Sequence, residues 1–146
     1  MFKFFKRNHL LILLVSILIV SIFCFETNNN SKMTNEKAES VISSYLMALS
    51  NKDKSAMKET ATKNYTKSLD DDGIELLKNT LKSAKLLNSN LINYDKNTAL
   101  VDAEVEIICY ADATSIGDWI PGKSISVKNF KLKKENGKWK VDDWGV

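Results

Sequence analysis

The chain offers few side chains that could carry out acid–base or metal chemistry. Its one histidine, His9, precedes the apolar N-terminal segment, so the domain that follows has no imidazole to serve as a base or a metal ligand. Asp102, Glu104 and Glu106 alternate with apolar residues, as on the solvent side of a half-buried strand. The sequence shows no nucleophile motif and no glycine-rich phosphate loop. We therefore predict no metal and no cofactor.

Asp143 is the one carboxylate that the pattern brings to the inner side of a sheet. Asn136 and Gly137 are typical of a two-residue hairpin turn, in which both positions need a positive φ. In that register Asp143 lies beside Phe130 and in phase with Trp139. A carboxylate in apolar surroundings has a raised pKa and can act as a base. Asp143 is therefore a weak candidate catalytic residue, and the alternative is a hydrated side chain past the end of the core.

Asp70, Asp71 and Asp72 are adjacent acids, and oxygen ligands are what calcium needs. The spacing of an EF-hand loop is absent, however. We interpret Asp72 instead as the N-cap of a helix, with Glu75 completing a pair that resembles a capping box.

The first 25 residues have the composition of a signal sequence or signal anchor. Lys3, Lys6 and Arg7 are followed by residues 10–25, which carry no charge. Positive charge stays on the cytoplasmic side, so the rest of the chain is predicted to lie outside the cell membrane. Three outcomes stay open: an uncleaved anchor that contacts the membrane through residues 10–25, a lipoprotein, or a cleaved and secreted domain.

The lipoprotein alternative depends on Cys24. Its position resembles that of the lipid-modified cysteine of bacterial lipoproteins, although Phe23 stands where that pattern has a small residue. Otherwise Cys24 is simply a small apolar residue in a hydrophobic run. Cys109 is the one other cysteine, so the domain has no intramolecular disulfide.

The charge of the exported part argues against nucleic acid as a partner. Lys3, Lys6 and Arg7 account for three of the 21 basic residues, which leaves 18 against 18 acidic residues, all of them at Glu26 or beyond. Every basic residue after position 25 is a lysine. A protein that binds nucleic acid carries net positive charge and forked arginine donors. We predict no nucleic-acid partner.

Hydrophobic periodicity predicts three helices followed by four strands. After a tether over residues 26–34, apolar residues recur at helical spacing, and from residue 86 they alternate. The order predicts an α+β domain over residues 35–146, in which three N-terminal helices pack on a curved antiparallel four-stranded sheet. The helices are expected at 35–51, around 56–60 and at 72–85, and the strands at 86–94, 99–109, from about 124 to the turn, and 138–144.

The C-terminal hairpin has one apolar and one lysine-rich side. Its turn places Leu132 opposite Val141. For the lysine-rich side two interpretations stay open: weak attraction to anionic lipid head groups or wall polymers, or a solvated face that discourages aggregation. The residues of this side are Lys131, Lys133, Lys140 and Asp142, with Lys128 nearby.

The third strand changes phase along its length. Ile125 and Val127 are out of phase with Phe130 and Leu132, which predicts a bulge near residues 128–129.

Two stretches of the sequence carry a resemblance to a known family. They are Glu39-x-Val41-x-x-x-Tyr45-Leu46-x-Ala48-Leu49-x-x-x-Asp53 and Phe130-Lys131-Leu132-x-x-Glu135-Asn136-Gly137-Lys138-Trp139-Lys140-Val141-Asp142. Through these stretches the chain resembles small extracytoplasmic nuclear-transport-factor-2-like (cystatin-like cone) domains of Gram-positive bacteria, most of which are of unknown function. The resemblance implies a cone of three helices and a bent sheet. Some members are isomerases or dehydratases with an Asp or a His–Asp pair inside the cone, and others are parts of secretion or conjugation machinery or ligand-binding lipoproteins.

Four aromatic residues are the candidate contacts of such a cone: Tyr45, Trp119, Phe130 and Trp139. We predict a membrane-tethered, extracytoplasmic, non-catalytic domain that binds a protein partner or a small apolar ligand. One alternative is a lyase or isomerase that uses Asp143. Another is a structural or dimerising subunit of an envelope or secretion complex. If the four aromatics fill the cone, only an interaction role remains.

Overall fold

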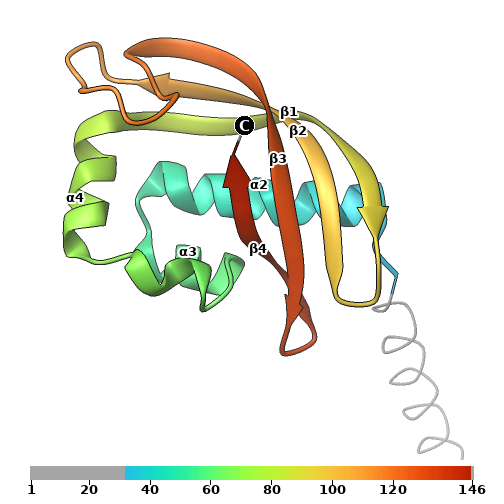
Figure 1. The fold of residues 1–146 in the computed structure, drawn as a ribbon. Helices are drawn as coiled ribbons and strands as arrows, with labels where there is room; N and C mark the ends of the chain where they lie inside the picture. The colour runs from blue at the N-terminus through green and yellow to red at the C-terminus, as the bar shows by residue number, and fades with distance from the viewer. Residues whose placement is uncertain (1–31, 146) are drawn as a thin grey trace, which may run out of the picture. The chain divides into compact units, whose positions relative to one another are not determined.

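A computed structural model describes residues 32–145 of the protein (Figure 1). The predicted signal segment, Cys24 and most of the predicted tether lie outside the described residues. Within the described part, no helix is both long and apolar enough to cross a membrane. The elements are helices α2 (Asn35–Asn51), α3 (Lys54–Thr60) and α4 (Asp71–Thr80), the 3-10 helix η1 (Tyr65–Ser68), and strands β1 (Leu81–Tyr94), β2 (Thr98–Cys109), β3 (Gly122–Glu135) and β4 (Lys138–Gly145).

The strands form one antiparallel sheet in the order β1-β2-β3-β4, a meander. The predicted α+β class, with helices preceding a four-stranded antiparallel sheet, is confirmed. In Figure 1 the longer strands bend over α2, which runs across one face of the sheet.

The core lies between α2 and the sheet. Every second residue of β2 is buried, from Ala99 to Cys109, as the alternating sequence predicts. The apolar stripe of α2 meets this face, because residues three and four apart lie on the same side of a helix. The residues at the centre of the core are Ile42, Leu46, Leu49, Val101, Val105, Ile107, Phe130, Leu132 and Val141, all 4% exposed or less.

Side chains at both ends of α2 cover the free edge of β1. The Asn35 amide donates to the Ser89 carbonyl oxygen at 3.2 Å and accepts from the Leu91 N–H at 2.8 Å. At the other end, Ser50 Oγ accepts from the Ala84 N–H at 2.7 Å and donates to its carbonyl oxygen at 2.9 Å. Unpaired backbone groups on an edge strand invite pairing with other chains, so these contacts protect the edge as well as hold the helix.

The opposite edge, β4, is covered by the chain that leaves α3. Ala61 forms a parallel bridge with Val141, and the Thr62 N–H donates to the Val141 carbonyl oxygen at 2.8 Å. The Thr62 hydroxyl also donates to Asp142 at 2.9 Å.

The N-caps of the three helices correct one prediction. The Thr34 and Asp53 side chains accept from the Lys37 and Ala56 N–H groups, as expected of N-caps. The cap of α4 is Asp70, whose carboxylate accepts from the Gly73 N–H at 2.8 Å. The prediction of Asp72 as the cap is therefore wrong: Asp70 has the extended backbone of a cap, and Asp71 and Asp72 occupy the first turn.

Helix α4 also ends earlier than predicted. Residues 81–85 were expected to continue the helix, but they begin β1, where Ala84 pairs with Ile107 and Leu81 with Cys109. The apolar pattern of this stretch suits either structure, and pairing with the buried strand β2 decides between them.

Strand β3 has no bulge, which corrects the predicted phase change. Its pairing with β2 continues from Gly122 to Lys133 without a register shift. Ile125 and Val127 therefore point outward, 49% and 55% exposed, and Lys128 points inward. The bulges lie instead in β1 and β4, with Lys82, Leu87, Ile92 and Asp142 as the extra residues.

Candidate functional site

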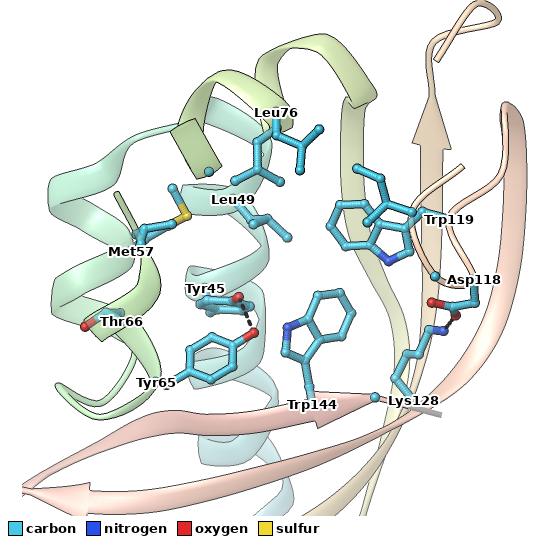
Figure 2. Close-up of a pocket in the computed structure, with 16 residues that line it drawn as sticks. Tyr45, Leu49, Met57, Tyr65, Thr66, Leu76, Asp118, Trp119, Lys128 and Trp144 are labelled. Carbon is cyan, nitrogen blue, oxygen red and sulfur yellow. Dashed lines mark hydrogen bonds and ion pairs between the residues drawn. The ribbon is translucent and has the colours of Figure 1, made fainter. Parts of the chain in front are cut away.

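A cavity of about 420 Å³ opens beside the core, between the helices, the loop over residues 110–121, the middle of β3 and the C-terminal end of β4 (Figure 2). The walls are mostly apolar, and every helix of the described chain contributes to them. The lining residues are Tyr45, Leu49, Met57, Tyr65, Thr66, Leu69, Gly73, Leu76, Leu77, Ile116, Gly117, Asp118, Trp119, Lys128, Trp144 and Gly145.

Trp144 is the centre of the aromatic wall. Its ring stacks on Phe130, with centroids 5.1 Å apart and planes 17° from parallel. It meets Tyr45 edge to face at 6.1 Å and Trp119 at 6.0 Å, both within the favourable range for aromatic pairs. The bulge at Asp142 turns Trp144 inward, because the extra residue shifts the alternation of β4 by one position.

Tyr45 and Tyr65 provide hydroxyl groups in the cavity wall. The Tyr45 hydroxyl donates to the Tyr65 hydroxyl oxygen at 3.3 Å. Burial raises the pKa of Tyr45 well above its usual value of 10.0, and the neighbouring Tyr65 adds to the rise. Burial likewise raises the pKa of Tyr65. Both hydroxyls are therefore neutral at physiological pH and can donate or accept a hydrogen bond, but neither is placed to act as a base.

Lys128 and Asp118 are the charged residues of the cavity lining. The Lys128 side chain is only 2% exposed, whereas the Asp118 side chain is 44% exposed, and the two form an ion pair. Apart from Asp118, the Lys128 ammonium has no hydrogen-bond partner in residues 32–145. Burial lowers the pKa of Lys128 below its usual value of 10.5. In Figure 2 the pair lies on one side of Trp119 and Trp144, and the two tyrosines lie on the other.

A tight turn holds Asp118 and Trp119 at the cavity. Ile116 and Trp119 exchange two backbone hydrogen bonds of 3.0 Å, so that Gly117 and Asp118 form a two-residue hairpin turn. Gly117 has a φ of +58°, which favours glycine at the first central position. The turn directs Asp118 toward Lys128 of β3 and Trp119 toward Trp144 of β4.

The structure divides the four predicted aromatic contacts. Tyr45 and Trp119 line the cavity. Phe130 is fully buried behind Trp144 rather than at the cavity surface. Trp139 pairs across from Lys134 in the hairpin, is partly buried against the core and is not among the lining residues.

The predicted inward position of Asp143 is wrong. Asp143 lies opposite Lys131 and is exposed, and Trp144 takes the place beside Phe130. The cause is the bulge at Asp142, which the regular register assumed for the hairpin did not include. No base of the kind proposed for the lyase or isomerase alternative therefore reaches the cavity from this position.

The lysine-rich side of the hairpin is less continuous than predicted. Lys128 is on the inner face, while Lys131 pairs with Asp142 at 3.5 Å and Lys140 with Glu135 at 3.6 Å. Lys133 is exposed and takes part in neither of these two ion pairs, so most of the charge on this side of the hairpin is balanced locally.

The sequence did not identify four residues that shape the site: Tyr65, Asp118, Lys128 and Trp144. Lys128 could have been found, because it is two residues before the inward-facing Phe130 and the alternation continues without a bulge. No local pattern marks Trp144 or Asp118. In residues 32–145 no three His, Cys, Asp or Glu side chains are grouped so that they could hold a metal ion.

No protein-family model and no curated protein matches this sequence. Several solved structures share its fold. A SEC-C motif containing protein from Rhodopseudomonas palustris is 14% identical, with a TM-score of 0.53 over 78% of this chain and 81% of that one. A candidate aromatic ring hydroxylase from Novosphingobium aromaticivorans is 16% identical, with a TM-score of 0.53 over 77% and 89%. The intermembrane space region of the chloroplast protein ARC6 is 14% identical, with a TM-score of 0.52 over 79% and 97%. Such low identities show a shared fold and carry no activity over to this chain.

Proposed function

We propose that this protein is a non-catalytic binding domain that holds a small, largely apolar ligand in the cavity beside Trp144. The observation that carries the proposal is the cavity itself: about 420 Å³ remains open although the aromatic side chains meet around it. Its volume lies in the usual range for small-molecule sites, and its walls combine apolar surface with a few polar groups, as such sites do.

The proposal includes the family and the location predicted from the sequence. The helices-then-meander order and the inward bend of the sheet support the nuclear-transport-factor-2-like family. The basic residues before the uncharged segment 10–25 support a membrane tether with the domain outside the cell. Mass spectrometry of the protein purified from membranes tests the tether: an intact N-terminus is expected, whereas an acyl group on Cys24 would establish the lipoprotein alternative and a cleaved, soluble product the secreted one.

Equilibrium dialysis with 2-naphthamide tests the binding proposal. This probe is neutral, flat and apolar, and the full chain in lipid nanodiscs is expected to bind it after binding to empty nanodiscs is subtracted. Leu76→Trp fills the mouth of the cavity, because Leu76 is half-exposed and lines it. Met47→Trp is the matched control, since Met47 is 60% exposed on α2 and does not line the cavity.

The expected result is that Leu76→Trp abolishes naphthamide binding and Met47→Trp leaves it unchanged. Absence of saturable binding to the unaltered protein, or equal binding by both variants, would refute the proposal. Leu100, Ile125 and Val127 are exposed on the outer face of the sheet. This apolar surface supports the second prediction, a protein partner or a homodimer.

A further inference from the structure

We propose that the ligand carries one anionic group, which replaces Asp118 as the partner of Lys128. This inference rests on the proposed function and specifies its ligand class: a small acid with an apolar, flat or aliphatic body and a single carboxylate, sulfonate or phosphonate.

The burial of Lys128 is the first argument. Its side chain is 2% exposed and lines the cavity from the middle of β3, where a strand otherwise places apolar or small residues inward. An ammonium group has three donors, and burying it without compensating partners is unfavourable. Among residues 32–145 the one acceptor offered to it is the Asp118 carboxylate. A charged group kept in an apolar wall with unused donors is suited to receive an anion.

The position of Asp118 is the second argument. Its side chain is 44% exposed and belongs to the two-residue turn after Ile116, on a loop rather than on the sheet. Lys128, by contrast, is fixed by continuous strand pairing on β3. Asp118 can therefore turn outward into water while Lys128 stays in place. The internal carboxylate occupies the position that a carboxylate of the ligand would take.

The other walls of the cavity indicate the shape and polarity of the part of the ligand that does not carry the charge. Trp119 and Trp144 lie between the ion pair and the two tyrosines in Figure 2, so an acid held at Lys128 would extend its body along the aromatic wall. Leu49, Met57 and Leu77 continue that wall. Tyr45 and Tyr65 are neutral, so their side chains carry no negative charge that would repel an anion.

The test compares two probes of the same shape, 2-naphthoate and neutral 2-naphthamide, by equilibrium dialysis against the full chain in lipid nanodiscs. The unaltered protein is expected to bind naphthoate more tightly. Lys128→Met is expected to lower the affinity for naphthoate relative to that for naphthamide about tenfold, the factor to which 1.4 kcal/mol of binding free energy corresponds. Lys133→Met, a change at an exposed lysine outside the cavity, is the matched control.

Asp118→Asn supplies a result of opposite sign. It removes the internal anion that competes for Lys128, so the affinity for naphthoate relative to that for naphthamide should be higher than in the unaltered protein. A residue with a merely structural role would not shift the two probes differently. This variant also keeps the inference testable if Lys128→Met does not fold.

Each outcome separates the two proposals. If naphthamide fails to bind the unaltered protein, the proposed function fails. If naphthamide binds but naphthoate shows no preference, or if the Lys128 and Asp118 changes affect both probes equally, the anionic ligand class is wrong and the apolar binding site stands.

Discussion

The ion pair between Lys128 and Asp118 predicts an asymmetry in stability between two single substitutions. Asp118→Asn leaves a charged ammonium in a site where its side chain is 2% exposed, with no other partner in the described part of the chain. Lys128→Met leaves a carboxylate that is already 44% exposed and can turn toward water. We therefore expect Asp118→Asn to lower the free energy of unfolding by more than Lys128→Met does.

The magnitudes follow from the burial of each partner. Removing one partner of a fully buried pair costs about 3–5 kcal/mol. Here water can reach the pair through the cavity and Asp118 is nearly half exposed, so we expect a loss of about 1.5–3 kcal/mol for Asp118→Asn, the range for a hydrogen bond to a charged group. A well-packed apolar replacement of a buried charge is often neutral or stabilising, so Lys128→Met should lie within about 1 kcal/mol of the unaltered protein.

Urea unfolding of a polypeptide over residues 32–146, followed by tryptophan emission, measures both changes. The midpoint and the slope together give the free energy of unfolding, and an unchanged slope shows that the unfolded states are comparable. The double variant should be no less stable than Asp118→Asn, because it carries no unpaired ammonium. A larger loss for Lys128→Met than for Asp118→Asn would refute the reasoning and show that the lysine stem, not its charge, is what the fold needs.

Two further predictions concern stability. Ser50→Ala should lower the free energy of unfolding by about 1–3 kcal/mol, since it leaves the N–H and carbonyl of Ala84 without the Ser50 hydroxyl. Ser44→Ala, at an exposed serine whose hydroxyl donates to Ser40 in its own helix, should change that free energy by less than about 0.5 kcal/mol. Urea midpoints of the two variants measure both changes. The pH dependence of unfolding should differ between the unaltered protein and Lys128→Met. Because the folded-state pKa of Lys128 is lowered below 10.5, the unfolded chain binds more protons than the folded chain at that residue just below that pH. The slope of stability against pH should therefore be more positive there in the unaltered protein than in Lys128→Met. Parallel slopes for the two proteins in that window would contradict the burial of a charged lysine.

Part of the fold could be predicted because the relevant signals are local. The start of α2 at Thr34, the alternation of β2 and the turn at Asn136 and Gly137 each depend on residues within a few positions of one another. The end of α4 could not be predicted in the same way, because residues 81–85 suit a helix and a strand equally and only pairing with β2 selects the strand.

The candidate site depends more strongly than the helices and strands do on contacts between residues that are far apart in the sequence. Tyr45 and Trp119 were predicted to meet at the cavity, and the structure places both in its wall. Asp143 was predicted inward and lies outward, because one extra residue at Asp142 reverses the alternation and brings Trp144 to Phe130. The bulge has no dependable local signature, since Asp142 accepts a hydrogen bond here from Thr62, 80 residues away in the sequence.

The sequence by itself determined the α+β order of elements, the apolar faces of α2 and β2, and the absence of imidazole from everything after His9. The tertiary structure alone decided which side chains meet in the cavity. It turned Lys128 inward because β3 keeps the phase that β2 imposes, and it brought Asp118 to that lysine from a loop ten residues earlier. Periodicity is a property of neighbouring residues, whereas the pairing of a buried charge depends on a partner that only the folded chain supplies.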